Sequence, residues 1–358
     1  MPMCNRKTPT VPLGTALAVA LCVALAGCGR AEPDLPVRSD ARHPGRFLHE
    51  FEALGTDATL MVAARDAAAA RDLFRPAVAA VRRVEARMST YRPESEISTL
   101  NRLGAREDVS LSEDTLQVLR EAVRFSRLTD GAFDVTYAPL RTLWRKAERE
   151  GRLPAEEEIA GALHAVGSDK LILGEHAARF TADGMEVDLG GIAKGYAIEL
   201  AAQAMKRAGA RSALVDVGGD MRVVGRREDG ARWQVEVRDP RPGARAPMVL
   251  ELEDAGVATS GDYARFFRVG EKTFSHIVDP RTGRAVRDVP SATVVAPDAT
   301  TADALATAAS VLGAQKALEL VNGLDGVECM IMARSGDSEA AEFTLYYSDG
   351  FRALMEEK

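Results

Sequence analysis

The chain has 358 residues and a formal net charge of -7 at pH 7, with 46 Lys and Arg against 53 Asp and Glu. The basic residues are scattered among acids and form no stripe, which argues against nucleic acid as a partner. A chain of this length is enough for one large domain or two closely joined ones, so an apolar core can supply its stability.

The N-terminal end has the pattern of an exported protein. Arg6 and Lys7 precede an almost wholly apolar run at 13–26, which is shorter than the run of about 20 residues that a membrane-spanning helix needs. The run ends in Leu-Ala-Gly followed by Cys28, which resembles a lipobox. We therefore predict a lipoprotein signal peptide at 1–27 and a diacylglycerol on Cys28. An ordinary secretory cleavage site beside a cysteine is the alternative.

The mature chain then divides into a tether and a folded domain. Residues 28–46 hold several prolines among charged residues, which predicts a lipid-anchored tether followed by one domain at 47–358. Two of the four cysteines leave with the signal peptide and Cys28 is acylated, so Cys329 is the one remaining thiol. This count excludes an intrachain disulfide.

The elements of the domain follow from apolar periodicity. Alternation through 47–63 around Gly55 predicts a hairpin or a long edge strand. Helical spacing predicts helices at 66–88 and 112–128, separated by a polar loop at 88–101 that could line a site. Further strands are expected at 170–173, 185–189, 212–217, 233–238, 248–252 and 292–296, and further helices at 194–208, 302–312 and 314–322. Because strands and helices do not alternate regularly, we predict an α+β fold.

Two glycine pairs follow predicted strands. In the first, at 187–196, the glycines precede a helix that begins near Lys194, so backbone amides and one ammonium could receive a pyrophosphate. A simple turn with a surface lysine is the alternative. In the second, at 215–220, Asp216 and Asp220 flank the glycines, and a structural bulge or turn explains it about as well.

Two further segments carry candidate chemistry. His276 lies beside Asp279 and Arg281, which indicates a polar pocket, although a lone histidine in a strand is more often structural. The helix after Thr300 or Thr301, either of which could be its cap, places Asp303 and Thr307 on one face. A carboxylate and a hydroxyl are hard ligands that suit Mg²⁺, whereas Asp303 alone could simply favour the helix dipole.

Taken in order, these segments resemble the ApbE family of magnesium-dependent FAD:protein FMN transferases. The resemblance covers nearly all of the mature chain. Its motifs are MSTYRPESEISTLN at 88–101, TDGAFDVT at 129–136, VDLGGIAKGYA at 187–197, VDVGGD at 215–220, TSGDYARF at 259–266, HIVDPRTG at 276–283 and DALAT at 303–307.

The resemblance implies an α+β, T-fold-related architecture of mixed sheets and packed helices, with the FAD site between two intimately joined lobes. It implies transfer of FMN from FAD, through a phosphoester, to a Thr or Ser of a membrane redox protein, with release of AMP. Mg²⁺ is the implied cofactor, and the acceptor subunit of a membrane redox complex is the implied partner.

The resemblance also assigns residues. Mg²⁺ would be held by Asp303, Thr307 and the carbonyl of Gly191, and the predicted catalytic residues are His276, Lys194 and Asp303, with His276 or a nearby carboxylate as the general base. Many relatives carry Met where Leu54 stands and a residue with a side chain where Gly191 stands. The implied flavin contacts are Leu54, Tyr91, Ala132, Phe133, Asp134, Asp188, Lys194, His276 and Ile277.

Three rival functions stay open at this point. An FAD pyrophosphatase would use water in place of the acceptor hydroxyl and yield FMN and AMP. A noncatalytic flavin-binding lipoprotein would bind FAD without phosphate chemistry, and a purely structural lipoprotein would leave the glycine pairs unexplained. The acceptors known for the family face the periplasm, so we expect a protein on the periplasmic side of the inner membrane, anchored through Cys28.

Overall fold

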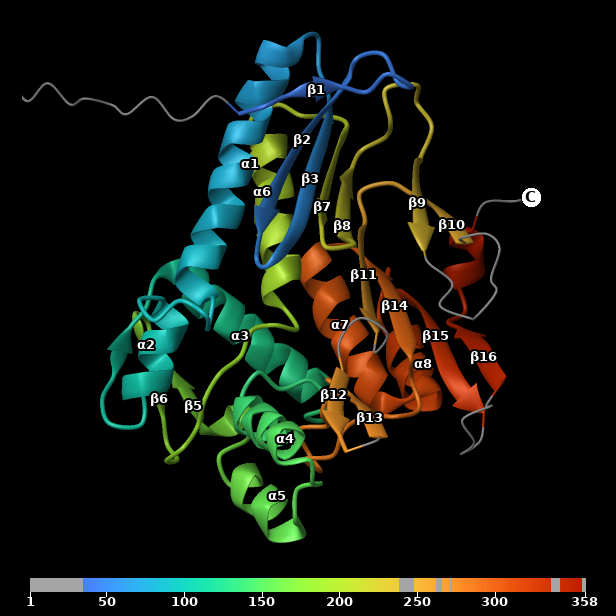
Figure 1. The fold of residues 1–358 in the computed structure, drawn as a ribbon. Helices are drawn as coiled ribbons and strands as arrows, with labels where there is room; N and C mark the ends of the chain where they lie inside the picture. The colour runs from blue at the N-terminus through green and yellow to red at the C-terminus, as the bar shows by residue number, and fades with distance from the viewer. Residues whose placement is uncertain (1–34, 238–247, 262–265, 271, 336–341, 356–358) are drawn as a thin grey trace, which may run out of the picture. The chain divides into compact units, whose positions relative to one another are not determined.

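The computed structural model describes residues 35–237, 248–261, 266–270, 272–335 and 342–355 (Figure 1). The predicted signal peptide, Cys28 and the first part of the predicted tether lie outside the described residues, so these predictions stay predictions. Residues from Leu35 onward form one compact unit. None of the helices in the described ranges is long and apolar enough to cross a membrane.

Nine of the described strands form one antiparallel sheet in the order β1-β2-β3-β7-β8-β11-β14-β15-β16. The neighbours β3 and β7 are far apart in sequence, because the chain between them forms two helices that pack on the sheet and a separate group of helices and small strands. The strands of the sheet are β1 (Arg38–Ser39), β2 (Arg46–Ala53), β3 (Thr56–Ala63), β7 (Ala213–Val217), β8 (Asp220–Val224), β11 (Gly256–Gly261), β14 (Ser291–Ala296), β15 (Glu328–Ser335) and β16 (Glu342–Tyr347).

The predicted hairpin at 47–63 is confirmed by the pair β2 and β3. Leu54 and Gly55 form its two-residue turn with φ values of 53° and 74°. Positive φ at both central positions matches the right-handed twist of the two strands. Leucine adopts this conformation only at a cost, and the Leu54 N–H donates to Glu85 Oε1 at 2.8 Å, which ties the turn to the neighbouring helix.

Four helices cover one face of the sheet (Figure 1). They are α1 (Ala67–Met88) and α6 (Ala193–Arg207), which pack on β3 and β7, and α7 (Ala299–Leu312) and α8 (Ala314–Asn322), which pack on the strands from β11 to β15. The other face packs against the hairpin of β9 (Trp233–Val237) and β10 (Met248–Leu252). Alternate residues of β7 and β14 enter the two cores, as the pleat of a strand requires.

The remaining elements form a helical group beside α7. It contains α2 (Glu96–Leu103), α3 (Glu113–Leu128), α4 (Ala138–Glu150), α5 (Glu156–Leu163), a small sheet of β4 (Val109–Ser110), β6 (Ala177–Phe180) and β5 (Leu171–Leu173), and the hairpin of β12 (Phe266–Val269) and β13 (Lys272–Ser275). Trp144 of α4 packs against Phe267 and Phe274 of this hairpin. The predicted α+β fold is confirmed, although α4 and α5 were not expected.

The prediction of a loop over the whole of 88–101 is wrong, because α2 begins at Glu96. Ser95 caps this helix by accepting from the Ser98 N–H at 3.0 Å, and Ile97 and Leu100 are fully buried three residues apart. The polar residues of the segment concealed a short amphipathic helix. Only the part before Ser95 is irregular.

The strand predicted at 185–189 is also wrong, although the segment is buried. Within it only Glu186 forms a bridge, to Tyr137. The Asn101 side chain takes the place of a neighbouring strand, since its Oδ1 accepts from the Val187 N–H at 2.7 Å and its Nδ2 donates to the Val187 carbonyl at 2.9 Å. A side-chain amide therefore satisfies the backbone that a ladder would otherwise pair.

Cys329 is a free, fully buried thiol on β15. Burial raises the pKa of this thiol to about 12. Within the described residues it is the one cysteine, so the predicted absence of an intrachain disulfide stays a prediction.

Candidate active site

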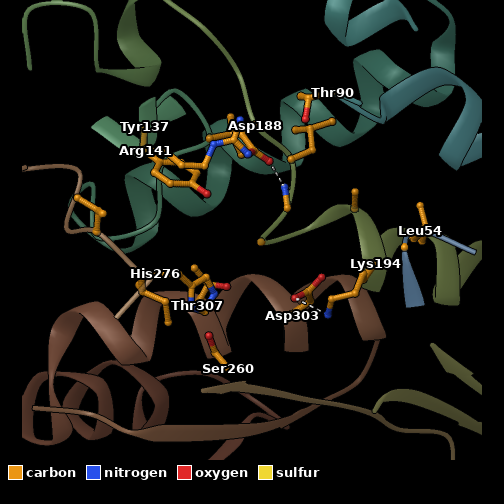
Figure 2. A pocket seen from close by; sticks show the side chains of 18 of the residues that line it. Leu54, Thr90, Tyr137, Arg141, Asp188, Lys194, Ser260, His276, Asp303 and Thr307 are labelled. Carbon is orange, nitrogen blue, oxygen red and sulfur yellow. Dashed lines mark hydrogen bonds and ion pairs between the residues drawn. The ribbon is translucent and has the colours of Figure 1, made fainter. Parts of the chain in front are cut away.

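A large cavity of about 1230 Å³ lies between α7 and the helical group that contains α4 (Figure 2). Its volume exceeds the range of about 300–1,000 Å³ that is common for drug-sized ligands, so a dinucleotide is an appropriate occupant. Segments far apart in sequence meet there. All of the residues predicted to bind flavin or metal line it: Leu54, Tyr91, Ala132, Phe133, Asp134, Asp188, Gly191, Lys194, His276, Ile277, Asp303 and Thr307.

The first glycine pair, Gly190 and Gly191, lies just before the start of α6. Gly191 lines the cavity just before the helix, and Lys194 stands in the first helical turn, as predicted. Gly195 is the point of closest approach between α6 and α7, because an added Cβ would collide with the Ala299 carbonyl oxygen and lie 2.7 Å from Asp303 Cβ. Glycine is required here so that the two helices can bring their polar residues together.

Lys194, Asp220 and Asp303 form an ionic group that we call the Lys194 cluster. Lys194 Nζ contacts Asp220 Oδ2 directly and lies 3.7 Å from Asp303 Oδ1. Asp303 Oδ2 accepts from the Gly195 N–H at 2.9 Å, and Asp220 Oδ1 accepts from the Thr259 N–H at 3.1 Å. Both carboxylates are buried, so the cluster holds fixed negative charge at the cavity wall.

The cap of α7 is Asp298, so the expected cap at Thr300 or Thr301 is wrong. Asp298 accepts from the Thr301 N–H at 2.8 Å and from the Thr301 hydroxyl at 2.7 Å. A carboxylate is at least as good a cap as a threonine hydroxyl, and it also meets the positive end of the helix dipole. Asp303 and Thr307 nevertheless lie one turn apart and both face the cavity.

The oxygens around Thr307 fit Mg²⁺. An added Cβ on Gly191 would lie 3.0 Å from Thr307 Oγ1, so the backbone of Gly191 approaches that hydroxyl closely. Asp303, Thr307 and Gly191 line the same cavity, and a carboxylate, a hydroxyl and a backbone carbonyl together would make a hard donor set. Among the described residues no three His, Cys, Asp or Glu side chains gather to hold a metal, and the predicted set includes a single carboxylate.

The opposite wall of the cavity comes from α4. Arg141 forms a direct ion pair with Asp188, whose side chain is 8% exposed, and Asp188 Oδ1 also accepts from the Gly190 N–H at 2.7 Å. Tyr137 lies beside this pair, and burial together with the Asp188 charge raises the pKa of its hydroxyl, which keeps it neutral. We call the cavity-lining residues Tyr137, Arg141, Arg145, Glu148 and Arg149 the α4 wall.

Asp134 is held inside the protein by several donors. Its Oδ1 accepts from the N–H and hydroxyl of Thr136 at 2.8 and 2.6 Å, and its Oδ2 accepts from Ser126 Oγ at 3.1 Å and the Ser168 N–H at 2.9 Å. This carboxylate therefore fixes the segment that carries Ala132 and Phe133.

Rings and an imidazole complete the cavity. Tyr91 is 77% exposed at its edge, where its hydroxyl accepts from Arg145 Nη2 at 3.5 Å, while Phe133 is buried against Phe125. His276, Thr307 and Ser260 also line the cavity (Figure 2). An exposed tyrosine ring and a buried phenylalanine offer two surfaces for the flat rings of a dinucleotide.

Some expected neighbours do not reach the cavity. Asp279 and Arg281 pair with each other at 2.9 Å and are absent from its lining, so the polar pocket predicted around His276 draws on other residues. Asp216 accepts from the Gly219 N–H at 2.9 Å, which makes it a residue of the turn, and burial raises its pKa. Residues 262–265 of the TSGDYARF motif lie outside the described residues.

Comparison with known proteins identifies the family. Residues 54–331 match the ApbE family. The chain belongs to that family. It is 34% identical to an FAD:protein FMN transferase of Haemophilus influenzae over 285 residues, which covers 77% of this chain and 81% of that protein.

Solved ApbE structures agree with this membership. The flavin transferase ApbE from Vibrio cholerae superposes with a TM-score of 0.75 at 27% identity, covering 89% of this chain and 100% of that one. The ApbE protein from Thermotoga maritima gives a TM-score of 0.76 at 31% identity, covering 87% and 100%. The predicted family and its α+β fold are thereby confirmed.

Proposed function

We propose that this ApbE-family chain is a magnesium-dependent FAD:protein FMN transferase. The observation that carries the proposal is the meeting of all the predicted flavin and metal residues in one cavity of about 1230 Å³. The FAD:protein FMN transferases of Haemophilus influenzae and Vibrio cholerae, at 34% and 32% identity, support the reaction class. The acceptor is a Thr or Ser hydroxyl of a membrane redox protein.

In the reaction the acceptor oxygen bonds to the FMN phosphorus of FAD, the diphosphate bridge breaks, and AMP leaves while the hydroxyl proton is lost. The ammonium of Lys194 meets the diphosphate, and Tyr91 and Phe133 hold ring systems. Asp303, Thr307 and the Gly191 carbonyl would hold Mg²⁺, which would supply charge neutralisation at the diphosphate. The chain's own residues act mainly by positioning the acceptor hydroxyl and the diphosphate of FAD.

His276 is the proposed general base because it lines the same cavity as Thr307 and Lys194. A His276→Asn variant should lower kcat and lose the acidic limb of the pH–rate profile, since asparagine cannot be protonated there. The measurement is FMN transfer against pH for both proteins. Undiminished transfer by the variant would remove His276 from the mechanism.

The test of the reaction incubates the purified protein with FAD, Mg²⁺ and a candidate acceptor, then weighs the acceptor and assays AMP. A mass gain equal to an FMN phosphoester, together with AMP, establishes the transferase. AMP and free FMN without a mass gain, repeated with several acceptors, indicate an FAD pyrophosphatase. Tight FAD binding with neither product indicates a flavin-binding protein.

Export and anchoring belong to the same proposal. The Leu-Ala-Gly-Cys28 sequence after an apolar run supports a lipid on Cys28, at the periplasmic side of the inner membrane. Labelling cells with radioactive palmitate should mark the protein, and a Cys28→Ala variant should take up no label. Fractionation of the two membranes would then locate the anchored form.

A further inference from the structure

The Lys194 cluster contains more negative than positive charge. Its two carboxylates are nearly inaccessible, with side chains 5% exposed at Asp220 and 7% at Asp303, and both lie within ion-pair distance of the one ammonium of Lys194. The cluster therefore carries a formal charge of about -1 in the cavity that Thr307 and Gly191 also line. Such a site attracts a further cation.

The two carboxylates are fixed, whereas the ammonium is not. Each carboxylate uses its second oxygen to accept from a backbone N–H, Gly195 for Asp303 at 2.9 Å and Thr259 for Asp220 at 3.1 Å. Lys194 carries its charge on a flexible four-carbon stem, and its side chain is 30% exposed. When the charges of the cluster rearrange, Lys194 is the member that moves.

We propose that Lys194 neutralises Asp303 until Mg²⁺ binds there, that the ammonium then shifts away from Asp303 toward Asp220, and that Asp220 is the positioning residue that keeps it in the cavity. The inference rests on the proposed function, because it takes Asp303 as a ligand of Mg²⁺. An ammonium and Mg²⁺ repel each other at one carboxylate oxygen. Asp220 gives Lys194 a partner beside the metal, so the ammonium stays in the cavity to meet the diphosphate.

Competition between Lys194 and Mg²⁺ fixes the direction of two changes in Mg²⁺ affinity, measured without FAD, and limits the size of a third. Lys194→Met removes the competing cation and should tighten Mg²⁺ binding about tenfold. Asp220→Asn leaves Lys194 with Asp303 alone and should weaken binding about tenfold, while its side-chain oxygen still accepts from Thr259. In the Lys194→Met background, Asp220→Asn should change the affinity by less than about threefold, since Asp220 acts through the lysine.

The experiment is isothermal titration calorimetry. Mg²⁺ alone is titrated into the purified protein, both single variants and the double variant, and the heat of binding gives the Kd for Mg²⁺. Lys206→Met is the matched control, because Lys206 lies in the last turn of the same helix and pairs with Asp254 at 3.8 Å, away from the cavity. Thermal unfolding in EDTA checks that every variant is folded. The opposite shifts of the single variants, with little further change in the double variant, are the expected result.

Three outcomes overturn the proposal. Equal Mg²⁺ affinity in all the variants would show that Lys194 and Mg²⁺ do not compete. An undiminished loss from Asp220→Asn in the Lys194→Met background would show that Asp220 acts on the metal directly. Absence of Mg²⁺ binding by the unsubstituted protein would remove the metal as well, and FMN transfer measured separately would still decide the reaction.

Discussion

The two walls of the cavity, the Lys194 cluster and the α4 wall, differ in charge and in how far each could be predicted from the sequence. The Lys194 cluster presents two buried carboxylates around one ammonium, whereas the α4 wall presents Arg141, Arg145 and Arg149 with only Glu148 among them. One side is suited to a cation and the other to anionic or flat groups. A dinucleotide held with a metal needs both, which explains why one cavity carries opposite charges at its two sides.

The largest effect is expected from the acidic wall. Asp303→Ala should reduce FMN transfer on the order of 10²–10³-fold, because the chain loses its one predicted carboxylate ligand for Mg²⁺. Asp298→Asn is the matched control, since it lies near the start of the same helix, is absent from the cavity lining and keeps a capping side chain. Transfer rates with excess Mg²⁺ decide the matter, and an active Asp303→Ala protein would contradict the assignment.

Close helix packing supports that wall, and Gly195→Ala tests it. The added methyl collides with the Ala299 carbonyl, so we expect a loss of about 1–3 kcal/mol in the free energy of unfolding and a fall of about 10-fold or more in transfer. Gly161→Ala, inside α5 with nothing within 4 Å of the new Cβ, should be neutral or stabilising. Chemical denaturation of both variants gives the comparison, and equal stabilities would refute the packing argument.

On the α4 wall, Arg141→Met should weaken FAD binding about tenfold and cost about 1–3 kcal/mol of stability, because Asp188 keeps a buried charge without its partner. Lys146→Met, on the same helix, is the control, since Lys146 is absent from the cavity lining and pairs with Glu158 at 2.8 Å. FAD fluorescence titration and thermal unfolding measure the two effects. Similar behaviour of the two variants would mean that the Arg141 pair does not organise the wall.

The smallest effect belongs to the edge of the cavity. Tyr91→Ala should raise the Kd for FAD by roughly two- to tenfold, the worth of one ring contact, and leave the unfolding temperature unchanged because the side chain is 77% exposed. Tyr91→Phe should bind almost as well as the unsubstituted protein. If the Phe variant loses as much affinity as the Ala variant, the contact with Arg145 matters more than the ring.

The sequence predicted the acidic wall more fully than the α4 wall, for a physical reason. The acidic wall is marked by local sequence patterns, namely the paired glycines, Lys194 and the Asp303–Thr307 spacing. Such patterns indicate their chemistry before the fold is known. The role of Arg141 depends on its ion pair with Asp188, which lies 47 positions away in the sequence. A contact over that distance leaves no local sequence pattern from which it could be predicted. Asp220 was noted for its place beside glycines, but its contact with Lys194 became visible only in the structure.

The errors in the elements have the same origin. The segment at 185–189 has strand composition, yet its backbone is satisfied by the side chain of Asn101, a tertiary contact that propensity does not include. The polar residues before α2 suggested a loop, but Ser95 caps a helix whose buried side is only two residues wide. Hairpins and long helices, which rest on local periodicity, were predicted correctly at β2–β3, α1, α3 and α6.

Cys329 is the one free thiol among the described residues, and its burial makes it a probe for unfolding of the chain. In the native state the sulfur is inaccessible and its pKa is about 12, so neither alkylating reagents nor another chain can reach it as a thiolate. In an oxidising medium a chain that opens even briefly can form a disulfide with a second opened chain, and that product does not refold. Heat damage should therefore accumulate as covalent dimers at a rate set by opening, and a reductant should slow it without altering the native protein.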